Sequence, residues 1–200
     1  EPALIHQAAE MYATAKPSAI IGWGMGVCQQ KQNLKTVHTI ASIACVAGQI
    51  GKPNSGLAPV RGQNNVQGSC DMGMLPNLYP GYQKVTDPAV RAKFAKAWGV
   101  PEEKLPLEEG YKLTDLGHLV DEGKVHCFYN YGEDPVQTEP DSAGMRKTLS
   151  ELDLFICQDI FMTQTTMLAD VILPATSWGE HEGVFTASDR SFQHFDAAVP

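Results

Sequence analysis

The chain has 200 residues, 43% of them hydrophobic and 19% charged, and it contains no low-complexity run. This composition excludes a disordered chain and permits either one large domain or parts of two. Fifteen lysines and arginines against 23 aspartates and glutamates give a net charge of −8, which argues against a surface for nucleic acid or anionic lipid.

The chain begins with Glu1 and shows no signal-peptide pattern, so we expect a segment of a longer protein whose targeting information lies elsewhere. No apolar run approaches the ~20 residues of a membrane span, and we expect no direct membrane insertion. A cytoplasmic location is favoured, and a periplasmic one stays open.

Helix and strand patterns alternate along the chain. Apolar residues at helical spacing predict helices over 2–15, 33–47, 89–98, 113–121, 142–152 and 163–169. In the helix over 33–47, the side chains expected on the buried side are Leu34, Val37, Ile40, Ile43, Ala44 and Ala47. Short apolar runs predict strands over 18–22, 125–131, 154–159 and 171–173, and a hairpin or edge strand within 183–195. This alternation indicates an α/β fold with parallel strands and crossover helices.

Ligands of such sheets bind beyond the carboxyl ends of the strands, and three predicted strand exits are glycine-rich or polar: 22–29, 132–138 and 158–163. The first resembles a dinucleotide fingerprint, but Val27 replaces the third glycine, so an NAD site is not expected. Asp134 and Asp159 could each accept hydrogen bonds from a guanine edge or ribose hydroxyls, or could instead cap the next helix. Trp178 is interpreted as a core residue, with stacking on a flat ligand as the alternative.

Residues 52–88 are dense in glycine, proline and asparagine and are too long for a simple connector, which predicts a functional loop. Within it, residues 61–68 (RGQNNVQG) place one arginine among amide side chains and glycines. A guanidinium can hold a carboxylate through two parallel hydrogen bonds, and glycine lets the backbone approach a ligand. An ordinary surface turn is the alternative.

The five cysteines are scattered and form no C-x-x-C pair, so a disulfide framework is not expected. Cys45 and Cys157 lie in apolar runs and are predicted to be small buried side chains. His181 and Glu182 lack the second histidine of a zinc-protease helix, and the sequence predicts no metal site made of protein ligands.

Several motifs together resemble the catalytic subunit of molybdopterin-dependent formate dehydrogenases, over nearly the whole chain. The most specific is residues 61–73 (RGQNNVQGSCDMG), and the others are 80–83 (PGYQ), 132–135 (GEDP), 158–163 (QDIFMT), 169–174 (ADVILP) and 178–183 (WGEHEG). The later motifs resemble the wider molybdopterin oxidoreductase family.

This resemblance implies Rossmann-like αβα architecture, with 1–62 ending one molybdopterin-binding domain and 63–200 forming most of a second. It implies a bis-molybdopterin guanine dinucleotide cofactor carrying molybdenum or tungsten, formate as the substrate, and a 4Fe-4S cluster in an N-terminal part outside this chain. Implied partners are the remaining domains of the subunit and iron–sulfur electron-transfer subunits, in anaerobic metabolism.

The resemblance also assigns site residues. Arg61 matches the arginine that faces formate beside the metal, in agreement with its suitability for a carboxylate. The positions that match cofactor neighbours are Met25, Gly26, Gln29, Gly62, Gln63, Gly132, Glu133, Asp134, Thr138, Gln158, Asp159, Leu173 and Pro174. The alternatives are another reductase of the family, such as a nitrate reductase, a nucleotide-binding module without turnover, or a structural electron-transfer subunit.

Overall fold

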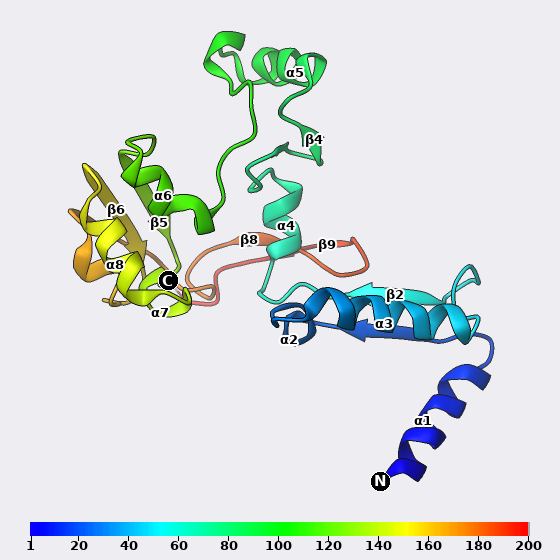
Figure 1. Ribbon diagram of the computed structural model, residues 1–200. Helices are drawn as coiled ribbons and strands as arrows, with labels where there is room; N and C mark the ends of the chain where they lie inside the picture. Colours follow the sequence, from blue (N-terminus) through cyan, green and yellow to red (C-terminus); the bar gives the residue numbers. More distant parts are fainter. Residues whose placement is uncertain (200) are drawn as a thin grey trace. The chain divides into compact units, whose positions relative to one another are not determined.

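A parallel strand pair and its crossover helix form the centre of the first part of the chain (Figure 1). Residues 1–199 are described by the computed structural model. The elements of this part are α1 (Pro2–Thr14), β1 (Ile20–Trp23), α2 (Met25–Cys28), α3 (Asn33–Val46) and β2 (Gly56–Pro59). Strand β1 pairs with β2 in parallel, from Ile20 opposite Gly56 to Trp23 opposite Pro59, and α3 runs alongside this pair.

Strand β2 corrects the expectation that residues 52–88 form one long irregular loop. The stretch also contains α4 (Val66–Asp71), β3 (Leu78–Tyr79) and the antiparallel β4 (Gln83–Lys84). Gly56 and Pro59 bound a run of two apolar residues only, so the strand signal was masked by residues typical of turns. A proline is tolerated there because β2 is paired on one side within the described residues.

A buried glutamine ties α1 to the strand pair. Gln49 is fully buried, its Nε2 donates to the carbonyl of Tyr12 at 3.1 Å, and its Oε1 accepts from the amide of Ala19 at 3.1 Å. The side chain therefore satisfies two backbone groups from segments that precede β1.

The sheet of the second part contains three parallel strands in the order β5-β6-β7. These strands are β5 (Cys127–Tyr131), β6 (Leu154–Asp159) and β7 (Val171–Pro174), and the helices between and before them are α6 (Leu116–Asp121), α7 (Pro135–Thr138) and α8 (Ser142–Ser150). The hydrophobic core beneath the sheet consists of Leu116, Val136, Leu149, Phe155 and Cys157. Parallel strands joined by helices confirm the predicted α/β class.

Two smaller packing units complete the second part. Asp87 caps the N-terminus of helix α5 (Pro88–Trp98), because its side chain accepts from the amide of Ala89 at 2.9 Å. Phe94 of this helix stacks on Tyr79, with ring centroids 4.8 Å apart. Strands β8 (Gly183–Thr186) and β9 (Phe192–Phe195) form an antiparallel hairpin. One of the two predicted possibilities for 183–195, the hairpin, is therefore confirmed.

The chain divides into two compact units. The first consists of residues 1–67 and 187–191, and the second consists of residues 68–186 and the residues from 192 on. The assignment of 1–62 and 63–200 to two molybdopterin-binding domains stays a prediction. Pro200, the last residue of the second expected domain, lies outside the described residues.

Three expectations about local structure are wrong. The helix predicted over 163–169 shrinks to a single 3-10 turn, Thr166–Leu168, because Thr163 and Thr166 bond each other's backbone: Thr163 Oγ1 accepts from the Thr166 amide at 3.1 Å. Cys45 is exposed rather than buried. Of the apolar residues expected on the buried side of α3, Ala44 is buried, whereas Leu34 and Ile43 are exposed.

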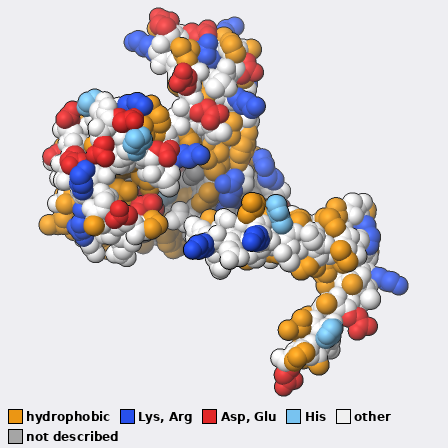
Figure 2. Space-filling model, in the orientation of Figure 1, with side chains coloured by type: hydrophobic (Ala, Val, Ile, Leu, Met, Phe, Trp, Pro, Cys, Tyr) orange, Lys and Arg blue, Asp and Glu red, His pale blue; other side chains and the backbone are white. Residues whose placement is uncertain are grey.

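These exposed side chains belong to an apolar surface of the first unit. Hydrophobic side chains gather over α1 and the adjoining part of α3 (Figure 2). Within the described residues, no helix is both long enough and apolar enough to cross a membrane.

Replacing Gln49 with leucine tests the tie between α1 and the strand pair. Leucine has a side chain of similar size but no amide, so the amide of Ala19 and the carbonyl of Tyr12 lose their hydrogen-bond partner. Each unpaired group costs about 1–3 kcal/mol. We expect hydrogen–deuterium exchange at the Ala19 amide to become at least about tenfold faster, whereas unchanged protection would contradict the role of Gln49.

Candidate functional site

The carboxyl ends of β1 and β2 bring two separate sequence segments together. Because β1 and β2 are parallel, Met25 and Arg61 each follow the same edge of the pair, and the Val60 amide donates to the Trp23 carbonyl at 2.8 Å. A cavity of about 460 Å³ opens at this edge. Its lining residues are Met25, Gln29, Arg61, Gly62, Gln63 and Val66.

Five of these six residues are positions that the sequence assigned to one site. Arg61 contributes a planar cation with five N–H donors, and Gln29 and Gln63 contribute amides that both donate and accept. Gly26, which the sequence also assigned here, follows Met25 in α2, and its carbonyl accepts from Gln30 Nε2 at 2.6 Å. The edge therefore offers donors for an anion and paired donor–acceptor groups for a heterocycle.

Gly62 is required by a close contact with Met25. A Cβ atom at position 62 would lie 2.5 Å from Met25 Cγ, closer than real Cβ atoms approach a neighbour. The absence of a side chain at Gly62 thus lets Met25 cross over the loop beside Arg61. Nearby, the buried Trp23 Nε1 has no hydrogen-bond partner within residues 1–199, which leaves a donor to be satisfied at the end of β1.

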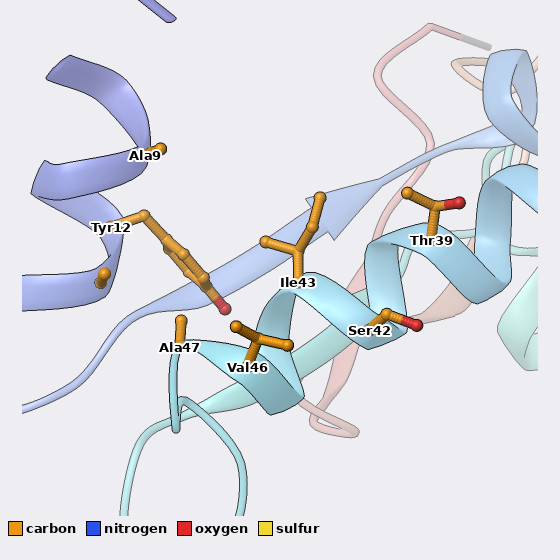
Figure 3. Close-up of a pocket in the computed structure, with 8 residues that line it drawn as sticks. Ala9, Tyr12, Thr39, Ser42, Ile43, Val46 and Ala47 are labelled. Atoms are coloured by element: carbon orange, nitrogen blue, oxygen red, sulfur yellow. The ribbon is translucent and has the colours of Figure 1, made fainter. Parts of the chain in front are cut away.

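A second cavity, of about 390 Å³, lies between α1 and α3. Figure 3 shows Tyr12 of α1 pointing toward Ile43 and Val46 of α3 and toward Ala47, which follows that helix. Small and apolar side chains line most of it, so it lacks the charged groups that a carboxylate or a phosphate requires.

The carboxyl ends of β5, β6 and β7 bring together the second set of predicted site residues. Gln158 lies opposite Leu173, and Asp159 lies opposite Pro174. The Gly132 amide donates to the Gln158 carbonyl at 2.9 Å, which attaches the loop after β5 to the end of β6. Residues that follow or end three different strands thus form one continuous edge of the sheet.

Gln158 uses its side chain to bridge all three strands. Its Oε1 accepts from the hydroxyl of Tyr129 on β5, and its Nε2 donates to the carbonyl of Pro174 on β7 at 3.3 Å. Both ends of the amide are therefore engaged within the protein. The side chain fixes the edge, which leaves the neighbouring backbone and side chains to meet a ligand.

Asp134 is held by a buried threonine rather than by a helix end. Its Oδ1 accepts from the amide of Thr165 at 3.2 Å and from the hydroxyl of Thr165, and no side-chain hydrogen bond caps α7. The Thr165 hydroxyl also accepts from the amide of Val136 at 3.1 Å. Asp134 thus occupies the N-cap position of α7, but its side chain does not cap that helix as the alternative supposed.

The other carboxylates of this edge also have defined partners. Glu133 Oε1 accepts from the Thr138 hydroxyl at 2.9 Å, which links two of the predicted cofactor positions directly. Asp159 Oδ1 accepts from the Phe161 amide at 3.2 Å in a short turn, so it does not cap a helix as the alternative supposed.

Asn130 and Thr165 are contributors that the sequence reasoning missed. The buried Asn130 donates from Nδ2 to the Glu133 carbonyl at 2.6 Å and to Cys157 Sγ at 3.3 Å. Burial raises the pKa of the Cys157 thiol, which keeps this cysteine protonated and excludes it as a nucleophile. An asparagine inside an apolar strand just before a Gly-Glu-Asp-Pro turn was the signal that could have identified Asn130.

Trp178 differs from its expected place in the core. Its side chain is 75% exposed, so the core interpretation is wrong for this structure. An exposed indole after the exit of β7 keeps the alternative, stacking on a flat ligand, as a prediction.

Comparison with known proteins then decides the family. A family model described as "Molybdopterin oxidoreductase" matches residues 4–200. The chain belongs to the molybdopterin oxidoreductase family. The motif-based resemblance is thereby confirmed at the level of the family.

Curated relatives within the family are named formate dehydrogenases. Formate dehydrogenase H of Escherichia coli (strain K12) is 58% identical over 195 residues, which cover 98% of this chain and 27% of that protein. The F420-dependent formate dehydrogenase 1 subunit alpha of Methanococcus maripaludis is 42% identical over 198 residues, covering 99% and 28%. The chain spans about a quarter of the length of these two relatives.

The fold of a molybdopterin oxidoreductase is supported by a solved structure. Acetylene hydratase from Pelobacter acetylenicus matches with a TM-score of 0.61 over 100% of this chain and 29% of that protein. At 20% sequence identity this likeness concerns the fold alone.

The residues present fit a molybdopterin cofactor. Pterin and guanine edges alternate donors and acceptors, as the amides of Gln29 and Gln63 do. The close approach of Gly62 to Met25 marks a place where backbone and side chain line the cavity without filling it. The buried Trp23 Nε1, at the end of β1, is a donor without a partner within residues 1–199.

Replacing Gly62 with alanine is expected to displace Met25. The added methyl group would lie 2.5 Å from Met25 Cγ, so Met25 must move from its place in the wall of the 460 Å³ cavity. We expect molybdenum or tungsten per full-length protein to fall several-fold, measured by mass spectrometry of the metal. Gly179→Ala is the matched control, because a Cβ atom there meets nothing within 4 Å; equal metal contents in both variants would refute the packing role.

Replacing Thr165 with valine keeps the shape of the side chain and removes its hydroxyl. The amide of Val136 then loses its acceptor and Asp134 loses a donor. A buried group without its partner costs about 1–3 kcal/mol, so exchange of the Val136 amide should be at least about tenfold faster. Thr114→Val, at an exposed position, is the control and should leave that amide unchanged.

Proposed function

We propose that this chain is the central segment of a formate dehydrogenase catalytic subunit that binds molybdopterin guanine dinucleotide and oxidises formate to carbon dioxide in the complete protein. The observation that carries the proposal is the cavity at the ends of β1 and β2, where Arg61 lies among the glutamines and Gly62. The 58% identity with a protein named formate dehydrogenase H supports the same activity.

Arg61 has the chemistry that formate requires. Formate is a small planar carboxylate, and a guanidinium fork can hold both of its oxygens through parallel charge-assisted hydrogen bonds. Held in this way, the C–H bond of formate points away from Arg61 and toward the interior of the site. Arg61 thus acts by orientation and electrostatics, and it carries no proton in the reaction.

The reaction converts formate into carbon dioxide, one proton and two electrons. When bound, the cofactor's molybdenum or tungsten supplies the acceptor for the two electrons. A carboxylate with a charge of −1 becomes a neutral molecule, so Arg61 binds the substrate more strongly than the product. This difference favours release of carbon dioxide after each turnover.

Two groups of residues would hold the cofactor. Met25, Gln29, Gly62 and Gln63 would contact a pterin, beside Arg61 and Gly26. The guanosine end would meet the second edge through Gly132, Glu133, Asp134, Thr138, Gln158, Asp159, Leu173 and Pro174. Electrons would leave through a 4Fe-4S cluster in another part of the subunit and through iron–sulfur partner subunits.

Arg61→Lys in the full-length enzyme tests the proposal. Lysine keeps the positive charge but cannot form two parallel hydrogen bonds to one carboxylate. The loss of one charge-assisted bond, about 1.5–3 kcal/mol, is expected to lower kcat/KM for formate by about 10–100-fold. Metal content should stay at the wild-type level, which separates substrate binding from cofactor loading.

Arg146→Lys is the matched control, because Arg146 is an exposed arginine of α8 that bonds Gln164. We expect this variant to retain wild-type kinetics. Formate oxidation that is equal in the Arg61 and Arg146 variants would remove Arg61 from the substrate site. A wild-type enzyme that reduces nitrate and leaves formate unchanged would instead place the protein among other reductases of the family.

A further inference from the structure

The β8–β9 hairpin separates its side chains onto two faces. Gly183 lies opposite Phe195, and Val184 lies opposite His194. Because side chains alternate along a strand, Phe185 and Phe195 share one face while His194 and Asp196 share the other. The register also places Glu182 across from Asp196, one position beyond the paired strands.

An aromatic cluster occupies the first face and fixes the hairpin's end. The rings of Phe185 and Phe195 have centroids 4.8 Å apart, and the His181 ring meets Phe195 edge-on at 5.5 Å. A Cβ atom at Gly183 would lie 2.7 Å from the Phe195 ring, so the ring covers the backbone there. His181 Nδ1 also bonds the Glu182 carbonyl at 2.8 Å, which orients the backbone that carries Glu182.

The opposite face gathers three metal-ligating side chains. One ligand atom from each of Glu182, His194 and Asp196 lies within 4.8 Å of the other two. His194 Nδ1 is 3.8 Å from Asp196 Oδ1. All three side chains are exposed, so a cation in solution can reach them without any opening of the fold.

The two carboxylates of this face, Glu182 and Asp196, favour the binding of a cation. Like charges directly across a strand pair repel each other, and Glu182 and Asp196 face each other in this way. His194 adds an imidazole nitrogen to this pair of carboxylates. A divalent cation would neutralise both carboxylates and use the neutral imidazole as a third ligand.

We propose that Glu182, His194 and Asp196 form a binding site for a divalent transition-metal cation of the zinc class. Imidazole nitrogen and carboxylate oxygen are ordinary ligands of Zn²⁺ and bind it at about 2.0–2.2 Å. Ligand atoms around such an ion lie about 3–4 Å apart, so rotation of exposed side chains by about an ångström closes the set. Water completes the coordination shell.

The cation would link the start of β8 to the end of β9. Glu182 precedes β8, whereas Asp196 follows β9, and a shared ion would join the two strands where their backbone pairing stops. The aromatic cluster holds the backbone on the other face, so binding requires movement of side chains alone. None of its three residues is a predicted cofactor position, and the proposal does not depend on the proposed function.

Metal titration of the full-length protein tests the site. The protein is first washed with a chelator, and Zn²⁺ is then titrated by calorimetry and Co²⁺ by visible absorption, which reports nitrogen and oxygen ligation. We expect one equivalent beyond the ions held elsewhere in the protein. Its affinity should fall at least tenfold in His194→Ala and in Glu182→Gln, which removes a charge at constant size.

His126→Ala is the matched control, because His126 is an exposed histidine paired with a single aspartate, Asp153, at 2.9 Å. This variant should bind Zn²⁺ and Co²⁺ like the wild type. Equal stoichiometry and affinity in the wild type, His194→Ala and Glu182→Gln would overturn the proposal. A Co²⁺ spectrum that is lost in the His126 variant and kept in the His194 variant would overturn it as well.

Discussion

The parallel pairing of β1 with β2 is the constraint on which the candidate substrate site depends. Parallel strands end at the same edge of a sheet, so the pairing of Trp23 with Pro59 brings Met25 next to the loop that carries Arg61. Backbone hydrogen bonds set this register, and the close contact between Gly62 and Met25 then determines how the two exits fit together. The position of Arg61 in the candidate site thus follows from the geometry of a short strand pair.

In the second unit, parallel strands also end at one edge of a sheet, but buried side chains hold the loops that follow them. Three strands end side by side, and the loops that follow them are held by side chains from within the fold. Asn130 supports the turn after β5, and Thr165 holds Asp134. These supporting residues are buried, whereas the positions that would meet a cofactor lie nearer the surface.

Strong periodic patterns were sufficient to predict much of the fold. Strand β6 occupies the predicted residues 154–159, since a short continuous apolar run bounded by polar residues is typical of a buried strand. Strand β2 was missed because Gly56 and Pro59 are typical of turns and because tertiary pairing decides the conformation there. The helix over 163–169 failed because threonine side chains compete for the backbone.

Exposure was predicted less well than secondary structure. Cys45 and Trp178 were expected in a core and are exposed, because apolar character alone does not say which face of an element is covered. For the site, the resemblance assigned Arg61 to the substrate and Met25, Gln29, Gly62 and Gln63 to the cofactor, and all five residues line one cavity. The supporting contacts of Asn130 and Thr165 could not be read from sequence, since they join distant positions.

The bridge that Gln158 makes from β5 to β7 has a thermodynamic consequence for binding. A ligand that settles on mobile strand ends must immobilise them, and that loss of conformational freedom subtracts from its affinity. Here the side-chain amide of Gln158 already joins all three strands in the folded protein. The edge is therefore preorganised, and a ligand that bound there would retain more of its contact energy as net affinity.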